Sequence, residues 1–332
     1  MIHINTLFDI ALIGFILDLL LGDPVYRYHP VRIIGHGISS MTNILRKIGS
    51  ANGKAGGLIM VILLLFIIIS SYVMISLGLF YVYPVFGILF DIFIFYSCLA
   101  MKDLIGHLDP VILSLKQSDL PEARKALAKV VGRDVHSLDE KGIIRAGIET
   151  MAENFVDGFL SPFFWYLAGG LMAEYLQIPI IRTGIAMMLV FKVASTFDSM
   201  VGYKNKEFIK IGWAGAKLDD LMNFIPARLS LIILFFGAAI CHLHPISGLQ
   251  TALRDRLKHE SPNAAHGESF VAGALGVRLA GPVMYPEGQR DKSWLGDEFS
   301  DPDIKHMRQT FILLKTSGWI SILLPLAFSI IF

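Results

Sequence analysis

The sequence contains little cysteine and little charge. Its only two cysteines, Cys98 and Cys241, both lie inside apolar runs. Two cysteines so far apart indicate neither a disulfide framework nor a zinc site. Charged residues make up 17% of the chain, whereas soluble globular domains average roughly 25%. The net charge is +1, so nothing indicates a polyanionic partner, and we expect no nucleic-acid binding.

Several common catalytic motifs are also missing from the sequence. There is no Walker A pattern and no GxGxxG, so a nucleotide, if one is used, is not held by a standard phosphate-binding loop. The absence of HExxH and GxSxG argues against zincin proteases and α/β-hydrolases. The first apolar run, Leu7–Leu21, has no basic segment before it and ends in Gly-Asp-Pro. We therefore expect a retained membrane segment rather than a signal peptide.

Long apolar runs, in contrast, are abundant. Hydrophobic residues make up 54% of the chain and the mean hydropathy is +0.59. A run of about 20 apolar residues is long enough to cross a bilayer as a helix. We therefore predict an all-α fold, a polytopic integral membrane helical bundle that forms a single membrane-embedded domain over residues 1–332. We expect about seven helices in this bundle, at Leu7–Leu21, Gly57–Phe80, Val82–Ala100, Phe159–Leu176, Ile178–Ala194, Phe224–Leu243 and Phe311–Phe332.

Four polar segments, all with Lys or Arg, separate the apolar runs. Hairpins return the chain to one face, so the first three segments should share a side, which the positive-inside rule makes cytoplasmic. The fourth segment is equally basic, yet it follows a single candidate span. We therefore expect either that Phe224–Leu243 is re-entrant or interfacial, or that one earlier helix is miscounted. The polar segments are Gly22–Gly56, Met101–Gly158, Ser195–Asn223 and His244–Thr310.

Two of these segments have recognisable local structure. A cytoplasmic helical segment is predicted at about 101–158, because Asp119-Leu-Pro-Glu122 and Ser137-Leu-Asp-Glu140 both have the capping-box pattern. A Gly-rich loop is predicted at about 244–310, where small residues would let the backbone approach a ligand or another helix closely.

Polar residues are densest in Lys192–Arg228. Carboxylates there could hold Mg²⁺, which stays partly hydrated and bridges phosphates, while cations could hold phosphate oxygens. The alternative is a helix start, whose acidic residues the helix dipole favours, with lysines that extend to the membrane surface. Asp198 favours the first interpretation, because a carboxylate at the end of an apolar run is costly. The candidates are Asp198, Lys204, Lys217, Asp219, Asp220, Asn223 and Arg228.

Two further groups carry charge near apolar runs. Glu149, Glu153 and Asp157 are spaced by four, which places them on one helix face as either a solvated stripe or a site for a metal or an amine. His29 and Arg32 follow the first apolar run, in a segment with two prolines. His29 could act as a base, as a hydrogen-bond donor to a phosphate or as a side chain that stabilises the turn.

Read in order, these segments resemble a known family. The motifs are D-x-L-L-G-D-P, H-P-V-R-x-I-G, E-N-F-V-D-G-F-L-S-P-F-F-W, F-K-V-A-S-T-F-D-S-M-V-G-Y-K, A-K-L-D-D-L-M-N-F-I-P-A-R and S-P-N-A-x-x-x-E-S-F-V-A-G-A-L-G-V, followed by a late Gly-x-x-x-Tyr. This series is similar to the CbiB/CobD family of cobalamin biosynthesis, adenosylcobinamide-phosphate synthase, over residues of about 9–296. Small departures occur at Ser195, Phe197 and Ala280-Gly281, and none removes a charged group.

The resemblance implies an enzyme, a ligase that forms a C–N amide bond with ATP as cosubstrate and Mg²⁺ as cofactor. It would join adenosylcobyric acid to (R)-1-amino-2-propanol O-phosphate, or to free aminopropanol, and give adenosylcobinamide phosphate. The hypothesis assigns Mg²⁺ to Asp198, Asp219 and Asp220. It assigns phosphate binding to Lys204, Lys217 and Arg228, with Asn223, His29 and Arg32 as weaker candidates. It assigns binding of the substrate's ammonium group to Glu153 or Asp157.

Two other functions stay open on the sequence alone. A distant relative of this fold is regarded as a non-catalytic membrane sensor linked to β-lactamase induction, and the chain could also be a small-solute transporter. Asp9, Asp18, Asp91 and Lys192 could form an ion path in the latter case. The partners implied are a corrinoid substrate and the lipid bilayer of the cell (cytoplasmic) membrane, with the active site on its cytoplasmic face. A homo-oligomer, or association with other cobalamin-pathway membrane proteins, is compatible with this.

Overall fold

A computed structural model describes residues 4–24, 26–47, 53–132, 134–203, 208–285, 288–290 and 292–331. Side chains are described for these residues except 4–6, 105, 283–285, 288–290, 328, 330 and 331. The structure is 77% helical, and the strands among its described residues are short. The prediction of an all-α polytopic membrane protein is therefore confirmed.

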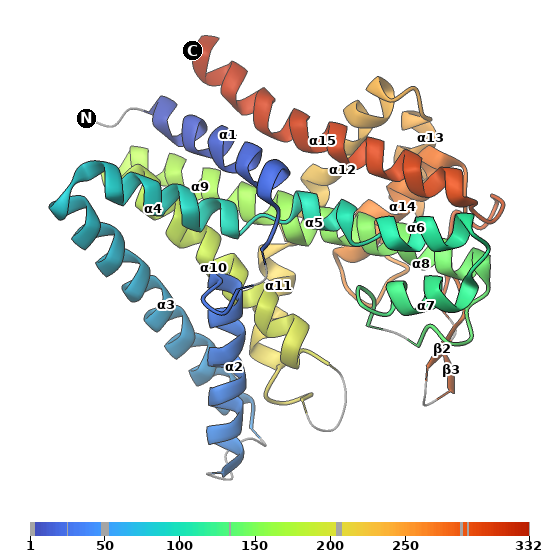
Figure 1. Ribbon diagram of the computed structural model, residues 1–332, viewed down its shortest axis with the longest axis horizontal. Coiled ribbons are helices and arrows are strands. Elements are labelled where there is room, and N and C mark those ends of the chain that lie inside the picture. Colours follow the sequence, from blue (N-terminus) through green and yellow to red (C-terminus); the bar gives the residue numbers. More distant parts are fainter. Residues whose placement is uncertain are drawn as a thin grey trace. The chain divides into compact units, whose positions relative to one another are not determined.

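The chain divides into two compact units (Figure 1). The first unit comprises Met1–Ala100, Ser161–Asn223 and Ile322–Phe332, and the second comprises Met101–Leu160 and Phe224–Ser321. Nothing in this grouping tests whether the chain folds as a single domain, so that expectation stays a prediction. The chain passes from one unit to the other at or directly beside a helix, not through long linkers.

The first unit is built from helices that are mostly apolar. Helices α3 and α4 form a hairpin, because Pro84 begins α4 two residues after α3 ends. Helices α9 and α10 form a second hairpin, closed by the turn at Gln177–Pro179. The elements are α1 Ile4–Leu21, α2 Pro30–Lys47, α3 Lys54–Val82, α4 Pro84–Ser97, α9 Ser161–Leu176, α10 Ile180–Val201 and α11 Trp213–Met222.

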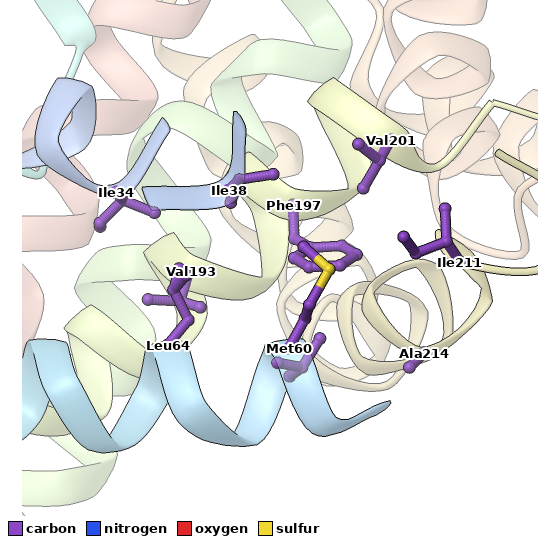
Figure 2. Packing of buried hydrophobic residues seen from close by; sticks show 10 residues of the cluster. Ile34, Ile38, Met60, Leu64, Val193, Phe197, Val201, Ile211 and Ala214 are labelled. Atoms are coloured by element: carbon purple, nitrogen blue, oxygen red, sulfur yellow. The ribbon is translucent and has the colours of Figure 1, made fainter. Parts of the chain in front are cut away.

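One core cluster of the first unit joins α2, α3, α10 and the start of α11. Figure 2 shows Phe197 of α10 at its centre, with Met60 of α3 pointing toward the aromatic ring. Ile34 and Ile38 of α2 cover this cluster, while the opposite face of α2 is polar and carries the exposed Arg32. Helix α2 is therefore amphipathic and packs its apolar face on the membrane helices.

Glycines allow the backbones of this unit to approach each other closely. A Cβ at Gly57 of α3 would lie 2.0 Å from the carbonyl oxygen of Ile211, and a Cβ at Gly212 would lie 1.8 Å from that of Val201. At Gly215 of α11 it would lie 2.1 Å from Cδ1 of Phe197. Because real Cβ atoms do not come this close, glycine is required for α11 to lie against the end of α10.

The second unit surrounds α14, a helix whose side chains are almost all buried. Helix α13 packs along it, and Gly273 lets the Ser247 carbonyl approach. The elements are α5 Met101–Gly106, α6 Asp109–Lys116, α7 Leu120–Leu127, α8 Glu140–Asn154, the π-helical segment η1 Phe155–Leu160, α12 Phe224–Ile240, α13 Pro245–Asp255, α14 Ala264–Leu275, β1 Leu279–Ala280, β2 Val283–Tyr285, β3 Gly288–Arg290, β4 Trp294–Leu295 and α15 Ile304–Ile331, which continues into the first unit from Ile322.

Most of the segment predicted as a Gly-rich loop is thus helix and short strand. Strand β1 pairs antiparallel with β4, and β2 pairs antiparallel with β3. Ion pairs around two aspartates hold this segment. Asp255, with no exposed surface, contacts Arg254 at 2.7 Å and Lys258 at 2.8 Å. Asp301 accepts two bonds from Arg278, both 2.9 Å long, which with Arg145 hold the pKa of Asp301 at about 2.

Five helices among the described residues are long and apolar enough to cross a membrane. All seven predicted apolar segments are helical, but α1 and α9, at Leu7–Leu21 and Phe159–Leu176, are not among the five. Helix α9 has 16 residues, which is short for a span. The topology around Phe224–Leu243 stays a prediction. The five candidates are Lys54–Val82, Pro84–Lys116, Ile180–Val201, Trp213–Ile240 and Ile304–Ala327.

The two capping boxes have different outcomes. Asp119 caps α7 as predicted, since its carboxylate accepts a bond of 3.0 Å from the Glu122 amide. The second box is wrong in register, because Asp139, not Ser137, is the residue that caps α8 and accepts from the Gly142 amide at 2.7 Å. Both Ser and Asp are good capping residues, so the spacing alone could not choose between Ser137 and Asp139.

The contact between α10 and α11 gives the first testable prediction. We expect Gly215→Ala to destabilise the protein by about 1–3 kcal/mol, because the added methyl group must displace the buried Phe197 ring. Gly78→Ala is the matched control, since no atom lies within 4 Å of a Cβ at that position of α3. Thermal unfolding in detergent is the measurement. Equal midpoints for both variants would show that α11 is not packed as described.

Candidate functional site

Most of the predicted polar cluster lies where α10 ends and α11 runs beside it, in the first unit. Asp198, half-buried, is in the last turn of α10, and its charge is close enough to that of Asp220 for the two to repel. Lys217 Nζ pairs with Asp220 Oδ2 at 3.1 Å. Two carboxylates and one ammonium group from separate parts of the sequence are therefore gathered at one end of this unit.

Asn223 connects this cluster to a third helix. Its Nδ2 donates to Asp219 Oδ2 at 3.1 Å, which confirms that these two residues share a helix face. Its Oδ1 accepts a bond of 2.5 Å from the hydroxyl of Ser161, the first residue of α9. Trp165, one turn later in α9, donates from Nε1 to the Met222 carbonyl at 2.9 Å. Asn223 is buried, so its contribution here is to position Asp219.

The helix dipole does not explain these carboxylates. Helix α11 begins at Trp213, so Asp219 and Asp220 lie in its last turn and not near its start. The chain continues into α12 at Phe224, so neither carboxylate lies near a helix start. The alternative interpretation, a helix start with acidic residues, is therefore wrong for α11. Repulsion between Asp198 and Asp220 is a cost that folding must offset.

A bound cation would offset this repulsion. Mg²⁺ is commonly held by one or two carboxylates and keeps several of its waters, and Asp198 and Asp220 offer such a pair. Gly202 leaves room for the Asp198 carboxylate, because a Cβ there would lie 1.9 Å from Asp198 Oδ1. No group of three or more His, Cys, Asp or Glu side chains in the described part of the chain could enclose a metal ion. Two carboxylates and several waters remain a possible ligand set for Mg²⁺, whereas the described residues do not bring three carboxylates together around one ion. Mg²⁺ binding by Asp198, Asp219 and Asp220 stays a prediction.

The predicted phosphate-binding residues are spread over both units. Lys217 and Arg32 belong to the first unit and are exposed. Lys204 lies outside the described residues. Arg228 is in the second unit, on α12, with its guanidinium 3.4 Å from the centroid of the Phe224 ring. The assignment of phosphate to these residues stays a prediction.

His29 lies in the turn before α2. Only 1% of its surface is exposed, and its Nε2 pairs with Asp23 Oδ1 at 2.7 Å. Its ring meets that of Tyr26 edge to face at 5.4 Å, and its carbonyl accepts from the Ile33 amide. Of the three roles considered for His29, these contacts support stabilisation of the turn.

The acidic stripe at Glu149, Glu153 and Asp157 is not one continuous face. Helix α8 ends at Asn154, and Asp157 lies in the π-helical segment η1, where the wider turn breaks the spacing of four. Glu149 is buried and accepts a bond of 2.9 Å from the Ala280 amide, so it holds β1 in place. Ala280 has a positive φ of 59°, which glycine adopts more easily. Glu153 and Asp157, both half-buried, remain the candidates for the ammonium.

A separate cavity lies at the other end of α10. It has a volume of about 670 Å³, and Asp91, Glu174 and Arg182 are among its lining residues. Asp91 is buried and accepts bonds of 2.8 Å from Tyr72 and Ser76. Arg182 and Asp198 are 16 residues apart on α10, which corresponds to about 24 Å along the helix. The cavity and the carboxylate cluster are therefore distinct.

Sequence reasoning did not identify Ser161, Trp165 or Gly202 as parts of the site. Ser161 and Trp165 occur inside the mid-chain motif E-N-F-V-D-G-F-L-S-P-F-F-W, and Gly202 occurs inside D-S-M-V-G-Y-K. The unusual density of polar and small residues beside apolar runs was the available signal. It could not show which side chains bond to Asn223 or which glycine makes room for Asp198.

Comparison with known proteins places the chain in one family. A family model described as CobD/Cbib protein matches residues 11–314. The chain is 38% identical to the "Cobalamin biosynthesis protein CobD" of Pelobacter propionicus, over 88% of this chain and 85% of that one. It is 35% identical to the protein of the same name from Clostridium perfringens, over 95% and 96% of the two chains.

A third relative has the other family name. The "Cobalamin biosynthesis protein CbiB" of Salmonella typhimurium is 34% identical, with 95% of each chain covered. No solved structure matches the chain. The residues that the family model matches include the candidate site residues from His29 to Arg228. This chain therefore belongs to the CobD/CbiB family, and it is a multi-pass membrane protein with a role in cobalamin biosynthesis.

Proposed function

We propose that this protein is an ATP-dependent ligase, an adenosylcobinamide-phosphate synthase. It joins the free carboxylate of adenosylcobyric acid to the amine of (R)-1-amino-2-propanol O-phosphate, or of free aminopropanol, and an amide forms. The observation that supports this best is the proximity of the Asp198 and Asp220 carboxylates at the end of α10, where Lys217 forms an ion pair with Asp220. The relatives of this chain are named for cobalamin biosynthesis.

The reaction explains why such groups are needed. A carboxylate does not react with an amine at neutral pH, because oxide would have to leave. Transfer of the γ-phosphoryl group from ATP to the carboxylate gives an acyl phosphate and ADP. The amine then forms the C–N bond, phosphate leaves with the C–O bond's electrons, and the nitrogen loses its proton to a base. Positioning and charge neutralisation are the main contributions a protein makes to phosphoryl transfer.

Residues of the first unit have the charges that the phosphoryl step requires. In the proposal, Asp198, Asp219 and Asp220 hold Mg²⁺, which neutralises phosphate charge when it is bound. Lys217 is exposed and flexible enough to exchange its contact with Asp220 for a phosphate oxygen. Asn223 fixes the carboxylate of Asp219 through the bond described above. A phosphate role for Lys204 and Arg32 is part of the same proposal.

Residues of the second unit are suited to the amine. Glu153 and Asp157 are carboxylates near the end of α8 and in η1, and either could accept a hydrogen bond from the ammonium and then its proton. The π-helical turn at η1 is a feature that often occurs at functional sites. In the proposal, Arg228 on α12 binds phosphate.

The large amphipathic corrinoid requires an open, partly apolar surface. Trp213 is 41% exposed at the start of α11, with Lys54 Nζ 4.8 Å from the centroid of its ring. An aromatic face beside cations is suited to a flat macrocycle with peripheral polar groups. In the proposal this surface faces the cytoplasm of the cell membrane, since the basic polar segments favour that side.

Amide formation by the purified protein tests the proposal. Full-length protein in detergent is incubated with adenosylcobyric acid, ATP, Mg²⁺ and either amine, and the corrinoid is analysed by mass spectrometry. We expect a mass gain that equals the amine minus water, together with release of ADP. No mass gain with either amine, from protein that is folded, would contradict the ligase. Corrinoid flux into proteoliposomes without a new amide would indicate transport instead.

A single substitution tests the metal assignment. We expect Asp219→Asn to lower the rate of amide formation by about tenfold or more and to raise the Mg²⁺ concentration needed for half-maximal rate, since one carboxylate charge is lost. Asp9→Asn is the control, because it removes the same charge from an exposed position of α1. Unchanged amide formation by Asp219→Asn at saturating Mg²⁺ would remove Asp219 from the metal site.

A further inference from the structure

The start of α14, in the second unit, has an unusual arrangement of polar groups. Asn263 precedes the helix, but its side chain does not cap the first turn. Its Oδ1 instead accepts a bond of 3.4 Å from Nη1 of Arg228. Arg228 comes from α12, where its guanidinium also donates to the Phe224 carbonyl at 2.6 Å and lies over the Phe224 ring. These contacts hold the guanidinium of Arg228 beside the start of α14.

A second cation lies close to the first. Arg256 follows α13, is half-buried, and has a charge near enough to repel that of Arg228. Its Nη1 donates to the Leu253 carbonyl at 3.1 Å. No carboxylate of the described residues forms an ion pair with either guanidinium. Two arginines held together without a counter-charge are a common arrangement for binding a phosphate or a carboxylate.

His266, in the first turn of α14, contacts Asn263, whose side chain accepts from Arg228, and it is within electrostatic range of both arginines. Only 1% of its surface is exposed, and its Nδ1 lies 3.2 Å from the Asn263 carbonyl, to which it can donate. Nε2, on the other side of the ring, has no hydrogen-bond partner in the part of the chain that the structure describes. Burial and then the charge of Arg228 lower the pKa of His266. A buried polar atom without a partner is costly, and a ligand atom would remove that cost.

A phosphate group satisfies all of these residues together. The first turn of a helix of 12 residues has amide N–H groups and a positive dipole end that favour an anion. The second pKa of a phosphate monoester is about 6, so one proton can be shared between a phosphate oxygen and Nε2 of His266. Glu268 does not oppose this, because two residues correspond to about 200° around the helix and turn it away from His266.

The end of α8 lies against this part of α14. A Cβ at Gly267 would lie 3.1 Å from the Ala152 carbonyl oxygen and 3.7 Å from Cγ2 of Val156. Glu153, the proposed acceptor of the ammonium, directly follows Ala152 in α8. The second unit therefore has a carboxylate and a cationic group on neighbouring helices. A molecule with both an ammonium group and a phosphate group could bind the first with its ammonium and the second with its phosphate.

We propose that Arg228, Arg256, His266 and the first turn of α14 form the binding site for the phosphate of a small phosphate monoester. The identity of this ester as the amine substrate rests on the proposed function, whereas phosphate binding itself does not. The site predicts a preference for phosphorylated over free amino alcohol, because free aminopropanol would leave the charges of both arginines without a counter-charge and Nε2 of His266 without a partner.

Direct binding tests the site without turnover. Full-length protein in detergent is titrated by calorimetry with inorganic phosphate and with (R)-1-amino-2-propanol O-phosphate, in the absence of ATP and corrinoid. We expect Arg256→Gln to weaken binding of both by roughly tenfold to a hundredfold, because a charged hydrogen-bond donor is lost. Arg308→Gln is the control, since it removes the same charge from an exposed position of α15 and should leave binding unchanged.

Steady-state kinetics distinguish the possible sources of the phosphate. We expect Arg256→Gln to raise the KM for the phosphorylated amine by a similar factor, while the KM values for ATP and for free aminopropanol do not change. Equal affinity of wild type and Arg256→Gln for both phosphate probes, or no binding by wild type, would overturn the site. A change confined to the KM for ATP would overturn the assignment to a small ester. Phosphate binding without any amide product would instead contradict the ligase and leave the site standing.

Discussion

The close contact between the end of α10 and α11 is the constraint on which the rest of the first unit depends. Gly212 and Gly215 have no side chains, so α11 can lie directly on the Val201 carbonyl and on the Phe197 ring. That contact brings Asp220 within electrostatic range of Asp198. The same core, built from Phe197, Ile38 and Met60, fixes the end of α10 from its other side. Packing thus holds two carboxylates at a distance that repulsion alone would increase.

Repulsion of this kind is a cost that folding must offset, and each unit has an example of it. Asp198 and Asp220 repel in the first unit, and Arg228 and Arg256 repel in the second. Elsewhere in the second unit, charges of opposite sign are paired, as at Asp255 and Asp301. Paired charges hold structure together, whereas like charges kept close are a common feature of sites that bind an ion of the opposite sign. A cation at the first pair and an anion at the second match the needs of an ATP-dependent amide ligation.

The sequence correctly predicted the features that depend on residues close together in the chain. Apolar runs predicted the membrane helices, and Asp119 capped α7 where its spacing to Glu122 indicated. The pairing of Asp219 with Asn223 followed from helical spacing. The acidic stripe was only partly predictable, because the π-helical turn at η1 depends on packing around α8 that four-residue spacing cannot reveal. His266 and Arg256 were missed because their contacts join three successive helices, α12, α13 and α14, whose packing against one another cannot be read from the sequence pattern.

The central claim is that the carboxylates of α10 and α11 hold a divalent cation. Electron paramagnetic resonance of Mn²⁺, used in place of Mg²⁺, tests it most directly, because free and bound Mn²⁺ give different spectra and no substrate is required. The account predicts that wild-type protein binds Mn²⁺ and that the double variant Asp198→Asn/Asp220→Asn loses this binding while its fold, measured by circular dichroism, is retained. Equal Mn²⁺ binding by the wild type and a folded double variant would contradict the account.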